Sequence, residues 1–91
     1  MRWRIIQALN IGRPAPLSED TLMQCVSGGD MPLQPHDLRV ELDYLETRKL
    51  IEISGRGTQP QWDSRLTRYG MDLAEYAIEC ESGIARPPKY W

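Results

Sequence analysis

Apolar residues recur at helical spacing in four segments of the chain, and the first two segments are separated by a proline-rich turn. Segment 2–11 carries one apolar stripe and stops before Gly12. The second segment begins after Ser18, a side chain suited to capping a helix N-terminus, and ends at the glycine pair 28–29. The inward-facing residues expected from these two stripes are Ile5, Ile6, Leu9, Leu22, Cys25 and Val26.

The third stripe belongs to a helix that begins at Pro35, a residue favoured at the first helical position. Leu38, Leu42 and Leu45 follow one another at i, i+4 and i+7, the pattern of a helix that packs on a core along one face. Leu33 stands at the spacing at which it can pack against Leu38 and fix how the chain enters the helix.

The last helix is expected over residues 68–81, with Thr67 as its N-cap and Gly83 closing it. One face gathers the residues expected to point inward, Tyr69, Leu73, Tyr76, Ala77 and Cys80. A second apolar stripe lies nearly opposite this face. Together with Ile84, which follows the helix, the second stripe predicts a homodimer. The expected dimer interface consists of Met71, Ala74, Ile78 and Ile84.

Between the third and last helices the apolar spacing changes to alternation, which predicts a β-hairpin. Segment 50–54 alternates apolar and polar residues, as a half-buried strand does, and segment 61–66 is the expected returning strand. The stretch GRGTQP between them is typical of a turn. Arg56, between two glycines, is therefore expected at the hairpin tip.

The expected order is helix, helix, helix, hairpin, helix within 91 residues, a length that supports one domain with one modest core. Three short helices cannot close a core of this size, so the hairpin must cover the open side. We therefore expect a mainly α fold with a β-hairpin over residues 1–82 and an extended C-terminal tail over residues 83–91. Tyr90 and Trp91 in that tail either fold back on the domain or dock a partner.

Two stretches, DLRVELDYLETRKLIEI and RLTRYGMDLAEY, resemble winged helix-turn-helix regulators of the MarR, PadR and ArsR types. In overall appearance the chain also resembles small Mu-like prophage proteins. The resemblance implies a three-helix core, a wing hairpin and a C-terminal helix, in a transcriptional or phage-type regulator that binds double-stranded DNA. The positions that carry it are Leu38, Leu42, Leu45, Glu46, Lys49, Leu50, Ile51, Leu66, Thr67, Gly70, Leu73 and Ala74.

The resemblance also implies that the third helix enters the major groove and that the hairpin tip reaches a minor groove. The expected DNA-binding residues are His36, Arg39, Val40, Asp43, Tyr44, Thr47, Arg56, Arg65 and Arg68. Two positions depart from the family pattern. Lys49 replaces a glycine, which costs strain if the backbone there needs a positive φ. Glu41 stands where these families have a small half-buried residue, so its carboxylate needs a partner.

The charge of the chain leaves a second function open. The formal net charge is -2, so the cations that DNA requires must come from local patches. Asp43 stands at the centre of the expected reading face, where a carboxylate repels phosphate. Arginines on a solvated hairpin can also serve only to keep a sheet edge soluble. A winged helix that binds a protein partner through this face, without DNA, is therefore the alternative.

No motif in the chain indicates an enzyme, a metal site or a cofactor. His36 is the single histidine, Cys25 and Cys80 are not at metal-ligand spacing, and there is no glycine-rich phosphate loop. Trp62 is expected to cover the edge of the core rather than to stack on a base. Two cysteines make no disulfide framework, and no stretch approaches the roughly 20 apolar residues of a membrane helix. These features predict a cytoplasmic protein with no membrane partner.

Overall fold

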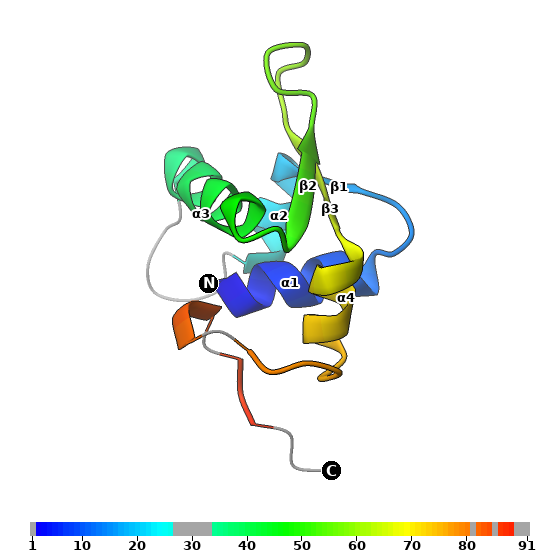
Figure 1. Ribbon diagram of the computed structural model, residues 1–91. Helices are drawn as coiled ribbons and strands as arrows, with labels where there is room; N and C mark the ends of the chain where they lie inside the picture. Colours follow the sequence, from blue (N-terminus) through cyan, green and yellow to red (C-terminus); the bar gives the residue numbers. More distant parts are fainter. Residues whose placement is uncertain (1, 27–33, 81, 85, 89–91) are drawn as a thin grey trace.

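The computed structural model describes residues 2–26, 34–80, 82–84 and 86–88 (Figure 1). Within them, short helices and a small antiparallel sheet give an α+β architecture. The elements in chain order are α1 (Arg2–Ile11), β1 (Leu17–Ser18), α2 (Glu19–Val26), α3 (Pro35–Thr47), β2 (Ile51–Ser54), β3 (Asp63–Leu66), α4 (Arg68–Ala74) and the 3-10 helix η1 (Ser82–Ile84).

The sheet has the strand order β1-β3-β2. The predicted hairpin is confirmed: β2 and β3 pair antiparallel, with Ile51 opposite Leu66 and Ile53 opposite Ser64. Strand β1 adds two residues on the other side of β3, where Leu17 faces Ser64. The sequence did not predict β1, because two residues are too few to show an alternating pattern.

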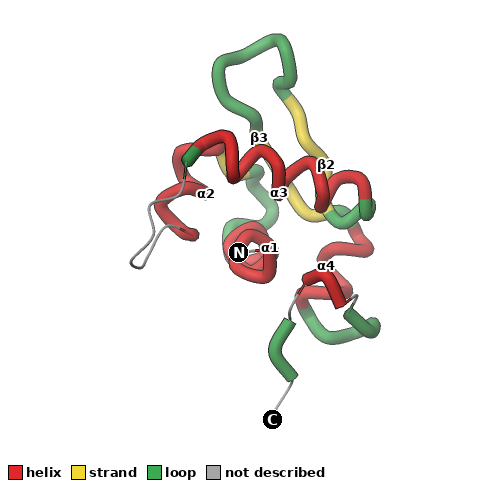
Figure 2. Tube along the Cα trace, turned by 90° about the vertical axis from the view of Figure 1, so that its left-hand side faces the viewer, coloured by secondary structure: helices red, strands yellow, loops and turns green. Residues whose placement is uncertain are grey.

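The core lies where α1, α2 and α3 meet the inner face of the sheet. Figure 2 looks along α1, while α3 runs across the view above it. Buried side chains from every predicted element contribute to one cluster, so the expected stripes are largely confirmed. Its members are Ile5, Ile6, Ala8, Leu9, Leu22, Val26, Leu38, Leu42, Leu45, Leu50, Ile51, Leu66, Leu73 and Ile84. Cys25, expected to face inward, is exposed, because Leu22 and Val26 already form the inner edge of the short helix α2.

The predicted helix starts are confirmed in atomic detail. Ser18 Oγ accepts a hydrogen bond from the Thr21 amide at 3.4 Å, and Thr67 Oγ1 accepts one from the Gly70 amide at 3.0 Å. Pro35 is the first residue of α3. The expected contact of Leu33 and the glycine stop of the second helix lie outside the described residues.

The step from α3 into β2 uses a left-handed residue, the condition under which a lysine at position 49 was expected to cost strain. Lys49 has a φ of 66° and its carbonyl accepts a hydrogen bond from Thr67 Oγ1 at 2.7 Å. Gly70 packs directly against this step, since a Cβ atom at Gly70 would lie 2.1 Å from the Leu50 carbonyl oxygen. A glycine at position 70 therefore has a steric reason.

The predicted extent of the last helix is wrong. Helix α4 ends at Ala74, and Tyr76 takes a left-handed conformation with a φ of 62°. Tyr76 Oη instead donates a hydrogen bond to the Pro87 carbonyl at 2.8 Å, and its ring meets Trp3 edge-on at 5.9 Å between centroids. The turn after Ala74 brings Ile84 back into the core, where it is 1% exposed.

The early end of α4 also overturns the expected faces of that helix. Ala77 and Cys80 lie outside it, and Tyr69, expected inside, is exposed. The supposed outer stripe is packed inward, because Met71, Ala74 and Ile78 all contact the core cluster and Ile84 belongs to it. Met71, Ala74 and Ile78 are therefore only partly accessible on the single chain, and Ile84 is buried. Within the described part of the chain, no helix has the length and apolar character needed to cross a membrane.

Candidate interaction surface

Glu19 at the start of α2 and Arg39 on α3 form the central ion pair of the surface shared by α3 and the hairpin. Arg39 donates from Nε and Nη2 to the two oxygens of Glu19, at 2.8 Å each. One of these oxygens also accepts the Trp62 amide at 2.5 Å. Glu19 is only 6% exposed, so its charge depends on these partners. The pair therefore joins α2, α3 and the start of β3 at one point.

The titration of this pair follows from its contacts. The hydrogen bonds from Arg39 lower the pKa of the Glu19 carboxyl below its ordinary value, and the Trp62 amide acts in the same direction. Burial of the carboxyl opposes them without reversing the shift. Glu19 in turn raises the pKa of Arg39. Both groups therefore stay charged at neutral pH, and each stabilises the charge of the other.

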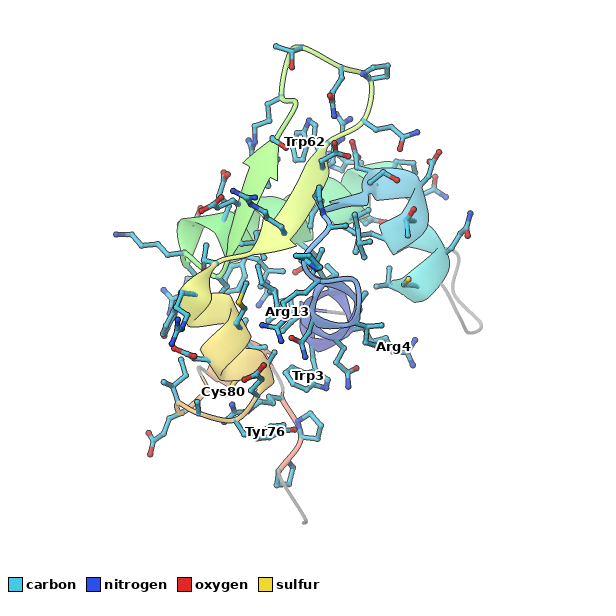
Figure 3. The ribbon with its side chains drawn as sticks, turned by 90° about the vertical axis from the view of Figure 1, so that its right-hand side faces the viewer. Trp3, Arg4, Arg13, Trp62, Tyr76 and Cys80 are labelled. Atoms are coloured by element: carbon cyan, nitrogen blue, oxygen red, sulfur yellow. The ribbon has the colours of Figure 1, made fainter. Side chains whose placement is uncertain are left out.

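The Trp62 side chain lies beneath two arginines. The guanidinium carbons of Arg39 and Arg56 lie 4.4 and 4.3 Å from the centroid of its ring, within the range of cation–π attraction. Figure 3 shows Trp62 at the base of the loop that joins β2 to β3. Its ring also packs against the core, which confirms the expected position at the core edge.

Arg56, expected to project from the hairpin tip, turns back toward α3. It donates to Asp43 and, at 2.9 Å, to Glu46. Glu46 also accepts the Ile53 amide at 3.3 Å and so covers part of the open edge of β2. We refer to Glu19, Arg39, Asp43, Glu46, Arg56 and Trp62 as the Trp62 cluster. In this cluster each guanidinium faces at least one carboxylate.

The rest of the expected reading face is mixed. His36, Val40 and Thr47 are exposed, and Val40 keeps 50% of its surface accessible. Tyr44 is half-buried beneath Arg2, whose guanidinium carbon lies 3.6 Å from the ring centroid. Only part of the expected face is therefore open to a partner.

Arg2, on α1, also forms an ion pair with Glu41, which supplies the partner that this carboxylate was expected to need. The same guanidinium donates to the Gly83 carbonyl at 2.9 Å. Arg2 therefore ties α1 to both α3 and η1.

Arg65 and Arg68 do not join the other expected DNA-binding residues. Arg65 pairs with Glu52 at 3.1 Å across the hairpin, and Arg68 lies 3.5 Å from Asp72 on α4. Both line a hollow together with Arg13, and no residue of α3 takes part in it. The structure thus divides the expected DNA-binding residues between two separate surfaces.

Sequence reasoning assigned Glu19 only to the positive end of a helix and missed its role in the Trp62 cluster. Nothing in the local pattern distinguishes Glu19 from the exposed Asp20 beside it. Among the described residues, no three potential metal ligands gather at one point. Comparison of the chain with models of protein families, with curated proteins and with solved structures found no match.

Proposed function

We propose that the chain is a winged-helix domain that binds a protein partner through α3 and the hairpin. The order helix, helix, helix, hairpin, helix supports the winged-helix assignment. So does the way the hairpin projects from the body beside α3 (Figure 1), as a wing does beside a reading helix. The charges of this surface are the reason for proposing a protein rather than DNA as the partner.

The bidentate ion pair between Arg39 and Glu19 is the observation that best supports the proposal. A base-reading arginine presents its planar donors to the major groove, but the Nε and Nη2 donors of Arg39 are held by a 6%-exposed carboxylate. Releasing Arg39 would leave the Glu19 charge buried without its partner, which is costly. Without Arg39, the exposed residues of the expected reading face are His36, Val40, Asp43 and Thr47, and the Asp43 carboxylate repels phosphate.

The exposed composition of the same surface suits a protein. Val40 presents an apolar side chain at the middle of α3, and the Trp62 cluster lies beside it with an aromatic ring and two arginines. Aromatic residues and arginine are enriched at the energetic centres of protein interfaces. A partner that covers Val40 and contacts Arg56 would meet both apolar and charged groups.

DNA binding is the second candidate, and the exposure of the Arg56 ion pairs favours it. Arg56, Asp43 and Glu46 keep 40% or more of their side chains accessible. Exposed ion pairs of this kind contribute little, so a DNA phosphate can take the place of a carboxylate. In this reading Arg56 swings outward to the minor groove while Arg39 remains with Glu19.

Fluorescence anisotropy with a short duplex of random sequence separates the two functions. DNA binding predicts association at about 50 mM salt that falls steeply by about 200 mM, because counterions are released, and that weakens in Arg56→Ala. The protein-binding proposal predicts no association at either salt concentration. Salt-dependent duplex binding that Arg56→Ala weakens would refute it.

A matched pair of surface variants tests the protein partner directly. Val40→Asp places a charge on α3, and Ile11→Asp makes the same change at an 84%-exposed position at the end of α1. A partner that cross-links to the wild-type chain in cells should be lost from Val40→Asp and retained by Ile11→Asp. Equal retention by both variants would show that α3 is not the binding surface.

A further inference from the structure

Three arginines from separate parts of the chain line one hollow between the end of α1, the sheet and α4. Arg13 comes from the turn after α1, Arg65 from β3 and Arg68 from the first turn of α4. Figure 3 shows Arg13 between the end of α1 and α4. Glu52 is the one carboxylate among the described residues that line the hollow. The residues that line the hollow thus carry three positive charges and one negative charge, whereas the formal net charge of the whole chain is -2.

The three arginines form exposed ion pairs, in which an anionic ligand can replace the carboxylate. Arg13 pairs with Glu75 at 2.8 Å, Arg65 with Glu52 at 3.1 Å, and Arg68 with Asp72 at 3.5 Å. In each pair both side chains are about one-third exposed or more, so each contributes little to stability. A ligand with two negative charges can therefore replace a carboxylate at low cost. Glu75 and Asp72 are not among the residues that line the hollow.

Part of the lining of the hollow is apolar. Leu9 and Leu66, both buried, are among its lining residues, and apolar groups screen the charges beside them less than water does. The hollow has a volume of about 280 Å³, slightly below that of a typical pocket for an organic ligand. Its size thus suits a compact anion better than a large molecule.

We infer that this hollow binds a small phosphate-bearing anion, with Arg13, Arg65 and Arg68 as its ligands. The planar guanidinium group matches the oxygens of phosphate with pairs of parallel hydrogen bonds, which makes arginine the side chain best suited to this group. Pyrophosphate, with more than one phosphate group, can contact more than one of the three arginines. The site is separate from α3 and does not depend on the protein partner proposed above.

Calorimetric titration of the full chain with inorganic pyrophosphate tests the inference. We expect saturable binding of one pyrophosphate per chain, weakened about tenfold or more in Arg13→Gln and in Arg65→Gln, because each loses charge-assisted hydrogen bonds. Arg4→Gln is the matched control, since Arg4 projects from the side of α1 away from Arg13 (Figure 3). It removes one positive charge from elsewhere and should leave the affinity unchanged.

A variant that binds pyrophosphate more tightly is also needed, because poor folding can explain a loss of affinity but not a gain. Glu52→Gln removes the carboxylate that lines the hollow and should tighten pyrophosphate binding about threefold. Titration with ADP shows whether the phosphate groups are also accepted when carried on a nucleotide. Absence of pyrophosphate binding would overturn the inference, as would equal weakening by Arg4→Gln.

Discussion

Glu19 receives two hydrogen bonds from Arg39, at 2.8 Å each, and this bidentate contact joins α2 to α3 across 20 residues of sequence. The Trp62 amide completes the coordination of the carboxylate. Because Glu19 is almost entirely buried, its charge depends on this contact, and our proposal of a protein partner rests on the same contact.

Replacing Glu19 with glutamine should lower the melting temperature by at least about 5 °C, because the charge-assisted bonds are lost at a buried position. Thermal unfolding followed by circular dichroism measures the change. Asp20→Asn is the matched control, since Asp20 is exposed and adjacent in sequence. Equal shifts in both variants would mean that Glu19 is no more important than a surface carboxylate.

The lowered pKa of Glu19 predicts a dependence of stability on pH. Arg39 lowers the pKa of the folded-state carboxyl below its ordinary value of 4.5, so the folded state binds this proton less readily than the unfolded state does. The resulting stability is fully present above about pH 4.5 and is lost as the pH falls through the folded-state pKa. The melting temperature should therefore fall more steeply below that pH in the wild type than in Glu19→Gln. Parallel curves would exclude the linkage.

Changing Leu42 to alanine should reduce the free energy of unfolding by about 2–5 kcal/mol, because it opens a cavity in a small core. Leu42 is 0% exposed and stands at the centre of the α3 stripe. Urea denaturation measures the loss, and Val40→Ala on the exposed face of the same helix should change it by less than about 0.5 kcal/mol. A loss in Leu42→Ala no larger than that of the control would contradict the packing of α3.

Lys49→Gly should stabilise the chain by about 0.5–1 kcal/mol, because Lys49 has a φ of 66° and glycine adopts this conformation without steric cost. Lys49→Ala removes the same side-chain charge but keeps the Cβ atom, so it should give no such gain. Urea denaturation of the two variants separates the backbone effect from the charge. A gain in both would assign it to the charge.

Gly70→Ala should cost about 1–3 kcal/mol, because the added methyl group would lie 2.1 Å from the Leu50 carbonyl and force α4 away from β2. Ala74→Gly is a useful contrast, since it changes a residue of similar size in the same helix without adding an atom. It should cost only about 1 kcal/mol, the usual helix penalty of glycine. A smaller loss in Gly70→Ala than in Ala74→Gly would refute the close contact.

The elements that could be predicted are those whose signal is local. The stripe of Leu38, Leu42 and Leu45 defines the inner face of α3, because helical periodicity places these residues together whatever surrounds them. Ser18, Thr67 and Pro35 mark helix starts through bonds and backbone angles within a few residues. The alternation that predicted the hairpin acts over the same short range.

The interaction surface and the end of α4 depend on residues far apart in the chain. The apolar spacing after Ala74 continues to suit a helix, but the burial of Ile84 and the Tyr76 contacts with Trp3 and Pro87 favour a turn there. The local sequence around an arginine likewise does not show whether its side chain faces solvent or a carboxylate. Arg39 contacts Glu19, and Arg13 lines one hollow with Arg65 and Arg68, only once the helices pack against the sheet. Charge acts through space over several ångströms, so the partners of a charged side chain are set by packing and not by spacing along the chain.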